Sequence, residues 1–232
     1  MSLEVFPIHG IPEVRQGDDL AAMIAAAEPA LQNGDVIVVT QKVVSKAEGA
    51  MARIDVTDPR GHKALVEDES VRVVRRRGDL IISETRHGFV CANAGVDLSN
   101  VDDGWAALLP DDSDRSARRI RDGLRAILGV EVGVIVSDTF GRPWRRGLTD
   151  VAIGCAGIKA VVDLRGTEDS RGRILQVTEV CVVDELAGAA DLVMGKATGV
   201  AAAVVRGVDP SWLGRGEVHA EIVRPPHEDL FR

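Results

Sequence analysis

The segment between residues 136 and 151, VSDTFGRPWRRGLTDV, holds the densest group of side chains that could do chemistry. Two aspartates, two threonines and three arginines follow an apolar run, EVGVIVS at 131–137, which predicts a buried strand. Carboxylates at strand ends, joined by hydroxyl, water and phosphate oxygens, are common ligands of hard cations such as Mg²⁺ and Mn²⁺. Asp138 and Thr139, at the predicted strand end, are therefore candidate cation ligands.

Two further carboxylates stand in similar settings. Asp97 lies in the glycine-containing segment AGVDLSN at 94–100, and Glu179 lies at the start of TEV at 178–180. Taken one at a time, these residues are better explained by structural roles, because Asp97 suits a turn and Asp138 or Glu179 suits a helix cap.

Cationic side chains gather in two places. Lys42 and Lys46 lie one turn apart on a helix predicted for residues 41–49, directly after the apolar run 36–40, so both could face a phosphate group at the helix start. A solvated basic face is the favoured alternative. The arginines of segment 136–151 offer bidentate donors to carboxylate or phosphate, although a surface charge run is the commoner explanation; they are Arg142, Arg145 and Arg146. Trp144 beside them either stacks on a ligand or fills the core.

Familiar nucleotide-binding loops are absent from the sequence. GKAT at 195–198 resembles the end of a Walker A loop, but Ala190 stands where its first glycine is required and Ala197 follows the lysine. No GxGxxG follows a predicted strand, which argues against a Rossmann dinucleotide site. His9 and His87 are lone histidines, and lone histidines are usually structural.

Composition argues against several classes of protein. With 232 residues and 45% hydrophobic side chains, the chain can bury a core of its own. A formal net charge of −8 and only 3% aromatic residues argue against a nucleic-acid partner. The three separated cysteines suit free thiols in a reducing compartment, and no apolar run is long enough for a membrane span. We therefore expect a cytoplasmic protein that binds neither nucleic acid nor membrane.

The elements that must position these residues are strands and helices in mixed order. Periodicity and turn signals predict strands at 3–9, 36–40, 80–84, 87–92, 131–137 and 201–206, and helices at 18–31, 41–49, 61–77, 113–128 and 178–194. Residues 136–151 are expected to form a polar loop, and 151–164 a strand and turn. Because hairpins are mixed with helices, the fold class is predicted to be α+β.

Six segments in chain order resemble the coenzyme F420-0:L-glutamate ligase family. They are PIHGIPEV (7–14), GDVIVVTQKVVSKAEG (34–49), AGVDLSN (94–100), SDTFGRPWRRGLTD (137–150), TEVCVVDE (178–185) and LVMGK (192–196). The resemblance covers nearly the whole chain and its motifs are long. It implies a single ligase domain over residues 1–232, in a stand-alone form without a nitroreductase-like domain. Whether two lobes hold the nucleotide–metal site between them is left open.

The resemblance implies an amide ligase that uses GTP. Members of the family join L-glutamate to coenzyme F420-0, and then add a further γ-linked glutamate, releasing GDP and phosphate. An acyl phosphate on the F420-0 carboxylate is the expected intermediate. The family implies an unusual mixed α/β ligase fold in an intertwined homodimer, with Mg²⁺ or Mn²⁺ and with K⁺ as a further cation. Two alternatives stay open: a ligase of the same fold that acts on an F420 variant or another phosphorylated acid, and a non-catalytic nucleotide-binding module.

Roles are carried over by position. The metal positions are Asp97, Asp138, Thr139 and Glu179, and the nucleotide positions are Ile11, Pro12, Glu13, Val14, Thr40, Gln41, Lys46, Asn100, Gly195 and Lys196. Asp138 and Lys46 are expected to act in phosphoryl transfer, in which catalysis is mostly positioning and charge neutralisation. Gln41 departs from the small hydroxyl residue usual in the family, which leaves its effect on nucleotide preference open. The roles of the three arginines and of Asp150 are left open as well.

Overall fold

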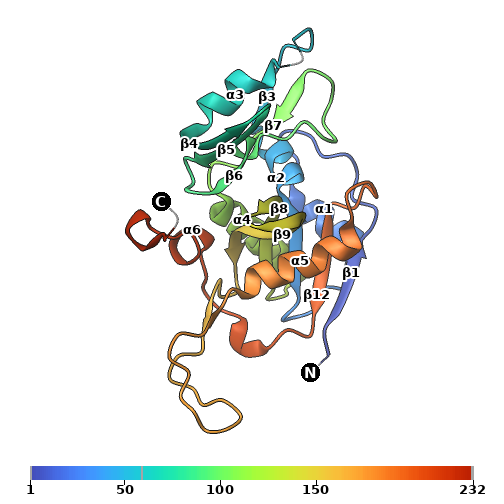
Figure 1. Cartoon of the computed structure of the whole chain (residues 1–232). Helices are drawn as coiled ribbons and strands as arrows, with labels where there is room; N and C mark the ends of the chain where they lie inside the picture. Colours follow the sequence, from blue (N-terminus) through green and yellow to red (C-terminus); the bar gives the residue numbers. More distant parts are fainter. Residues whose placement is uncertain (1, 59, 231–232) are drawn as a thin grey trace.

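The centre of the fold is a mixed sheet of five strands (Figure 1). The computed structural model describes residues 2–58 and 60–230. The strand order is β1 (Glu4–Ile8), β12 (Ala202–Arg206), β2 (Val36–Thr40), β8 (Gly133–Arg142) and β9 (Arg145–Ala156). Only the central pair, β2 and β8, is parallel, while the remaining neighbours pair antiparallel. The α+β class is confirmed.

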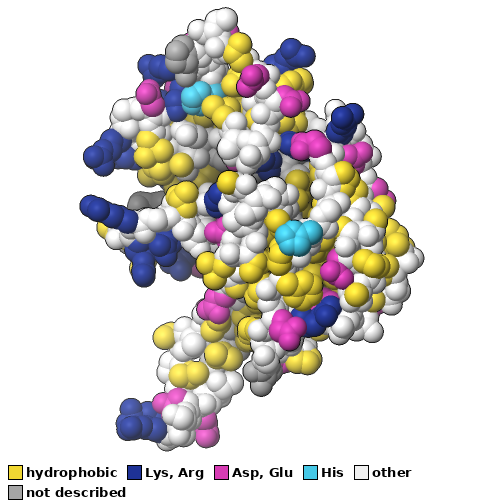
Figure 2. Space-filling model, turned by 90° about the vertical axis from the view of Figure 1, so that its right-hand side faces the viewer, with side chains coloured by type: hydrophobic (Ala, Val, Ile, Leu, Met, Phe, Trp, Pro, Cys, Tyr) yellow, Lys and Arg dark blue, Asp and Glu magenta, His cyan; other side chains and the backbone are white. Residues whose placement is uncertain are grey.

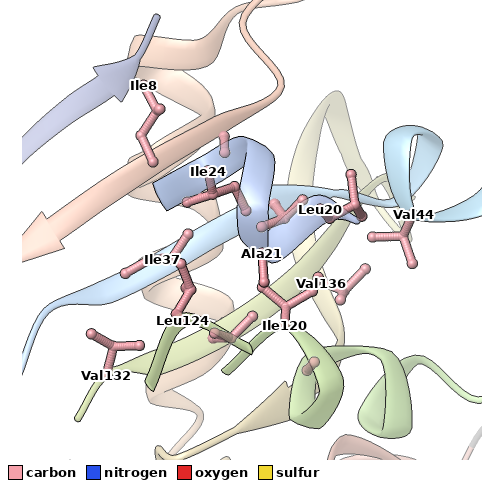
Figure 3. Close-up of a cluster of buried hydrophobic side chains, with 14 of the residues drawn as sticks. Ile8, Leu20, Ala21, Ile24, Ile37, Val44, Ile120, Leu124, Val132 and Val136 are labelled. Atoms are coloured by element: carbon pink, nitrogen blue, oxygen red, sulfur yellow. The ribbon is translucent and has the colours of Figure 1, made fainter. Parts of the chain in front are cut away.

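Helices cover both faces of this sheet, which explains why its central strands are apolar at nearly every position. On one face, α1 (Leu20–Ala27), α2 (Gln41–Glu48) and α4 (Ser113–Leu128) pack against Ile37 and Val136, as Figure 3 shows. On the other face, α5 (Val182–Met194) packs against Val38 and Ile135. Side chains alternate across a strand, so neighbouring residues of β2 and β8 enter different layers.

Helix α4 has the limits that the sequence predicts. The Asp112 carboxylate accepts a hydrogen bond from the backbone N–H of Arg115, and Gly129 ends the helix with a φ of 71°. Gly123 lies so close to α1 that an added Cβ would stand 2.5 Å from the Cβ of Ala21. Glycine at this position therefore allows the two helices to pack closely beneath the sheet.

A smaller lobe is formed mainly by residues 51–107 and lies above the main sheet in Figure 1. It contains the antiparallel pair β3 (Met51–Arg53) and β7 (Trp105–Ala107), and the three-stranded sheet β4 (Ser70–Arg77), β5 (Leu80–Thr85) and β6 (Val90–Ala92). Helix α3 (His62–Asp68) and the short 3₁₀ helix η1 (Asn93–Gly95) complete it. Val66, Ile81 and Ala106 belong to a separate apolar cluster in this lobe.

The single helix predicted for residues 61–77 is wrong beyond residue 68. The chain forms α3 and then turns into β4, which pairs antiparallel with β5 through two register shifts. The segment SVRVVRRR is rich in β-branched residues, and pairing with β5 satisfies its backbone. The 80–92 hairpin is confirmed, with its second strand restricted to β6.

Residues 136–151 form a β-hairpin rather than the predicted polar loop. Strands β8 and β9 stay paired from Val134 and Ala156 out to Arg142 and Arg145, and only Pro143 and Trp144 form the turn. Residues 141–148 are exposed beyond the end of the main sheet, and this explains why a paired hairpin has a polar sequence. Trp144 is 82% exposed, so it does not fill the core.

A long arm, residues 162–180, extends from the body below the main sheet (Figures 1 and 2). Its base is the short antiparallel pair β10 (Val162–Asp163) and β11 (Glu179–Val180). The predicted helix 178–194 begins only at Val182, because the chain before it belongs to this arm. After β12 the chain forms η2 (Pro210–Trp212), α6 (Val218–Glu221) and η3 (Pro226–Glu228). Within 2–58 and 60–230, every helix is too short or too polar to cross a membrane.

Candidate functional site

The parallel strands β2 and β8 end side by side, and most of the predicted site residues gather there. Thr40, the last residue of β2, pairs with Ser137 of β8, and the Thr40 amide bonds to Ala201 just before β12. Helix α2 starts directly after Thr40, and the segment after α5 arrives from the other face. The carboxyl ends of parallel strands commonly hold ligands, because loops and helix N-termini converge on them.

Asp138 and Thr139 are neighbours on β8, but their side chains point to opposite faces of the sheet. The Thr139 hydroxyl donates to Asp150 on the α5 face, as does the hydroxyl of Ser137 two residues earlier. The Asp138 carboxylate accepts from the backbone N–H of Thr139, and the charges of Asp97 and Lys42 act on it from the other face. The cation ligands expected from one short motif therefore divide into two polar clusters.

The first cluster joins the smaller lobe to the main sheet. Lys42 Nζ of α2 lies 2.8 Å from the Asp97 carboxylate and 2.6 Å from the Ser99 hydroxyl. Burial alone would raise the pKa of Asp97, but hydrogen bonds from Lys42 and from Ser99 lower that pKa below its usual value. Asp97 is therefore held as a carboxylate at neutral pH.

Asp138 is the second carboxyl group of this cluster, and its ionised form is disfavoured. Burial, together with the negative charges of Asp97 and Asp150, raises the pKa of Asp138 to about 7, although the hydrogen bond from the Thr139 amide and the charge of Lys42 act in the opposite direction. A partly buried carboxylate that ionises this reluctantly lacks sufficient positive charge around it. An added cation would supply that charge.

The second cluster lies on the α5 face and centres on Asp150, whose side chain is 3% exposed. One carboxylate oxygen accepts from Thr139 Oγ1 at 2.6 Å and from Lys196 Nζ at 2.8 Å, and the other accepts from Ser137 Oγ at 2.9 Å. Lys196 also bonds to the Asp191 carboxylate at 3.0 Å and to the Thr139 hydroxyl. One ammonium thus bridges the two carboxylates of this cluster.

The turn at residues 11–14 reaches α2 through one ion pair. The carboxylate of Glu13 is bonded to the ammonium of Lys46, whose side chain is only 15% exposed. Ile11 packs against the core and Val14 is buried in it, while Pro12 and Glu13 are exposed. Glu13 is thus the residue of this turn whose side chain contacts Lys46, a lysine predicted to bind phosphate.

Gln41 does not direct its side chain into the site. It is 1% exposed, and its amide nitrogen donates to Ser45 Oγ and to the Leu108 carbonyl, both at 2.6 Å. Its longer side chain therefore fixes α2 to the smaller lobe. Asn100 is exposed, has a φ of 53°, and lies three residues after Asp97 at the edge of the first cluster.

Glu179 is not brought to either cluster within one chain. It lies on β11 at the base of the arm and pairs with Arg165 at 3.2 Å. Helix α5 separates it from Lys196, and 13 helical residues span roughly 20 Å. The predicted grouping of Glu179 with Asp138 and Thr139 is therefore not found in the single chain.

The three arginines of the β8–β9 hairpin are exposed and stand beyond the polar clusters. Arg142 donates to the backbone carbonyl of Arg146 across the turn. All three cysteines are free. Burial raises the pKa of Cys91 to about 12, and the nearby Asp138 carboxylate adds to that shift, so this thiol is unreactive at neutral pH.

In the part of the chain that the structure describes, no group of three or more His, Cys, Asp and Glu side chains is assembled to hold a metal. Asp97 and Asp138 nevertheless fit a hard cation, because they are two oxygen donors with excess negative charge at a strand end. Mg²⁺ is often held by one or two protein carboxylates together with substrate phosphates and water.

Three residues of these clusters were missed as site residues from the sequence. The sequence offers Lys42 as a residue that could face a phosphate, although a solvated basic face is favoured, and it leaves Asp150 unassigned. Asp191 carries no signal in the sequence beyond its place near the end of a helix. The antiparallel pairing of Asp150 with Thr139 would have placed that aspartate, but it requires knowledge of the hairpin register.

The fold and the two clusters define an α+β protein with an anionic centre at the end of a mixed sheet, flanked by lysines that suit phosphate. The model of the F420-0:Gamma-glutamyl ligase family matches residues 10–207, and this chain belongs to that family. Proteins named coenzyme F420:L-glutamate ligase are similar along the whole chain. The one from Methanopyrus kandleri is 44% identical over 100% of this chain and 98% of its own length. Those from Methanothermobacter thermautotrophicus and Archaeoglobus fulgidus are 43% and 39% identical, over 100% of this chain and 100% and 97% of their own lengths.

Proposed function

We propose that this protein is a GTP-dependent ligase that joins L-glutamate to coenzyme F420-0 and then adds further γ-linked glutamate. The observation that carries this proposal is the first cluster, in which Asp97 and Asp138 lie beside Lys42, within a chain that is similar over its full length to ligases of that name. The free cysteines suit a reaction in the cytoplasm.

Amide formation from a carboxylate requires activation of one oxygen. In the first step, the γ-phosphoryl group of GTP is transferred to a carboxylate oxygen of F420-0, which yields an acyl phosphate and GDP. In the second step, the amine nitrogen of glutamate attacks the carbonyl carbon, the C–N bond forms, and the C–O bond to phosphate breaks. The amine loses its proton and inorganic phosphate leaves, so every atom is accounted for.

The chain's own residues contribute charge and position to these steps. Lys46 lies where its ammonium can contact the nucleotide phosphates once Glu13 gives way, and Lys42 keeps Asp97 ionised beside Asp138. Asp97 and Asp138 would hold Mg²⁺ or Mn²⁺, which neutralises charge on phosphate oxygens when it is bound. The exposed arginines of the hairpin remain available for an anionic substrate.

The nucleotide is expected to lie between the 11–14 turn and the segment after α5. Thr40 ends β2 with a side chain that makes no capping hydrogen bond to α2. The N-terminus of α2 also offers backbone N–H groups there, which suits a phosphate. Asn100 and Gly195 border the same region from the smaller lobe and from the end of α5.

The test is mass spectrometry of products after incubation with F420-0, L-glutamate, GTP and Mn²⁺. The proposal expects products heavier by one or more glutamate residues, with GDP released only when F420-0 is present. Asp138→Asn should abolish both readouts, while Asp103→Asn, an exposed aspartate in the smaller lobe, should leave them unchanged. GTP binding without any product would identify a binding module instead. A product formed only from another phosphorylated acid would identify a different substrate.

We also propose that the protein acts as a homodimer in which the arm packs against a second copy. Val177 is 84% exposed and Ile174 is 48% exposed, although both are apolar and lie on a segment that stands clear of the body (Figure 2). Contact with another chain would cover these side chains. Light scattering should give a mass twice 24.7 kDa for the wild type.

The matched variants are Val177→Asp and Val56→Asp, since Val56 is 67% exposed but lies outside the arm. Val177→Asp should shift the mass toward the monomer, and Val56→Asp should not. A dimer of unchanged mass and dissociation constant in Val177→Asp would remove the arm from the interface.

A further inference from the structure

A cavity of about 290 Å³ lies at the edge of β9, where the smaller lobe and the C-terminal segment meet the main sheet. Its walls are mostly apolar and come from the turn before β6, from β8 and β9, and from the chain after α6. The apolar side chains that line it are Phe89, Val90, Phe140, Val151, Ile222 and Val223. A concave, largely apolar cavity of this size suits part of an organic molecule better than an ion.

Two phenylalanines give the cavity an aromatic wall. The rings of Phe89 and Phe140 meet edge to face, with centroids 6.0 Å apart and planes at 75°. Only four phenylalanines occur in the chain, so half of them line this one cavity. Both side chains are only partly buried, which leaves ring surface on which a further flat ring can pack.

Contacts between distant segments of the chain fix the shape of the cavity. Val223 packs so closely against the turn before β6 that a Cβ added to Gly88 would lie 2.7 Å from Val223 Cγ1. On the side of α5, the Asp184 carboxylate accepts from the Ala152 N–H at 2.8 Å. One of the charged lining residues is therefore already bonded to the edge of β9; the others are Arg224 and Asp229.

The cavity adjoins the first cluster. Val151 lies directly opposite Asp138 in the β8–β9 ladder, and opposite residues of an antiparallel pair project to the same face with Cβ atoms about 5 Å apart. Phe140 follows Asp138 by two residues on β8, so its side chain is on that face as well. Two walls of the cavity therefore lie beside a carboxylate that is expected to bind the divalent ion.

The strand order separates the cavity from the region expected for the nucleotide. Strand β8, which carries Asp138, lies between β2 and β9. The Lys46–Glu13 ion pair joins α2 to the 11–14 turn on the side of β2, whereas the cavity is on the side of β9. In phosphoryl transfer the attacking and leaving oxygens lie roughly in line on opposite sides of the transferred group. A nucleotide from one side and an acid from the other meet this requirement at Asp138.

We propose that the cavity binds the acceptor acid, whose flat aromatic ring system packs against Phe89, Phe140 and Val90 while its carboxylate is directed to Asp97 and Asp138. The inference rests on the proposed function, which names F420-0 as the acceptor, and adds the place of its ring system. Val90 and Phe140 are then residues that determine which acids are accepted. A phosphorylated acid without a ring would leave the cavity unfilled and would be a poor substrate.

The test fills the cavity from an exposed position. Val90 lines the cavity and is 42% exposed, so Val90→Trp should fold while its indole occupies the place of the ring system. Val71→Trp is the matched control, because Val71 is 68% exposed on β4 of the same three-stranded sheet and lies outside the cavity. Isothermal titration with F420-0 without GTP gives the Kd, and steady-state kinetics give the KM for F420-0 and for GTP.

Val90→Trp should raise the Kd and the KM for F420-0 by about tenfold or more and leave the KM for GTP within about twofold. Val71→Trp should match the wild type in all three values. Phe140→Leu tests the aromatic wall without added bulk, because it keeps an apolar side chain against the core and removes the ring. Its Kd for F420-0 should rise roughly three- to tenfold.

Wild-type affinity for F420-0 in both Val90→Trp and Phe140→Leu would overturn the inference. A raised KM for GTP alone in Val90→Trp would also overturn it, since the nucleotide base would then occupy the cavity. Failure of the wild type to form product from F420-0 would remove the proposed function. Even then, F420-0 binding that is weakened in Val90→Trp but not in Val71→Trp would support the cavity as the site of the ring system. A wild type that does not bind F420-0 at all would overturn both.

Discussion

Asp138 and Thr139 are adjacent on β8, yet the carboxylate lies near Asp97 and Lys42 while the neighbouring hydroxyl is bonded to Asp150 and Lys196. The alternation of a strand produces this difference, because consecutive side chains enter different layers of the fold. Asp138 therefore belongs to the cluster with Asp97 and Lys42, and Thr139 belongs to the cluster with Asp150 and Lys196.

The first prediction concerns the stability of the metal-free protein. The pKa of Asp138 is raised to about 7, above a value of about 3.9 in an unfolded chain. Ionisation of this carboxylate in the folded protein therefore costs stability as the pH rises from about 4 through 7, and the cost is absent at lower pH. Asp138→Asn keeps an oxygen that can accept from the Thr139 amide, so it should stabilise the protein at pH 8 by on the order of 1 to 3 kcal/mol.

The measurement is urea unfolding of both proteins at several pH values without metal. The difference should shrink steadily as the pH falls from 8 to 4. Asp103→Asn, exposed in the smaller lobe, should show no such trend. If Asp138→Asn is no more stable than the wild type at pH 8, ionisation of Asp138 does not lower the free energy of unfolding.

The second prediction concerns Lys42. Its ammonium lies 2.8 Å from Asp97, so it repels any divalent ion that binds there. Lys42→Met should therefore bind Mn²⁺ more tightly, by roughly tenfold at low salt, while ligation slows because the charge beside the phosphates is lost. Isothermal titration with Mn²⁺ at pH 8 measures the first effect, and product formation measures the second.

Lys46→Met serves as the matched control, because Lys46 pairs with Glu13 rather than with Asp97. It should raise the KM for GTP and leave the affinity for Mn²⁺ nearly unchanged. Weaker Mn²⁺ binding by Lys42→Met would show that the lysine supports the cation site instead of competing with it.

Some elements of the fold can be predicted from the sequence, and others cannot. Helix α4 was predicted at its observed limits, because Asp112 and Gly129 supply local capping signals. Residues 70–77 were assigned to a helix, and the β8–β9 hairpin to a loop, because strand pairing depends on partners that lie elsewhere in the chain. Local patterns contain no information about such partners.

The candidate site shows the same division. Asp97, Asp138 and Lys42 come from a loop of the smaller lobe, a central strand and a helix, and no spacing rule connects them. The sequence offers Asp97, Asp138 and Glu179 as separate candidates, and the family resemblance assigns all of them to metal binding, but the single chain places Glu179 beyond the far end of α5. The cluster of Asp150 and Lys196 could be recognised only from the hairpin register and the chain direction after α5.

The third prediction concerns Gln41, the departure from the family pattern. Because its side chain is 1% exposed and bonded to Ser45 and Leu108, Gln41→Met should cost about 1 to 2 kcal/mol of stability and leave the KM for GTP unchanged. Urea unfolding and steady-state kinetics of the same preparation measure both values. A large change in KM with unaltered stability would instead place this side chain at the nucleotide.

The last prediction concerns Asp114, a buried carboxylate remote from the clusters. It accepts hydrogen bonds from the backbone N–H groups of Cys155, Val218 and His219 at 2.8, 2.9 and 3.2 Å, and so joins α4 to β9 and α6. Asp114→Ala leaves these buried donors without a partner and should cost about 3 to 5 kcal/mol.

Urea unfolding of Asp114→Ala measures this loss. Asp122→Ala, on the same helix with a side chain that is 61% exposed, should change stability by no more than about 0.5 kcal/mol. Product formation by the folded fraction of Asp114→Ala should stay near that of the wild type, because the carboxylate touches neither cluster. A folded, stable Asp114→Ala without activity would mean that the junction of α4, β9 and α6 takes part in the reaction.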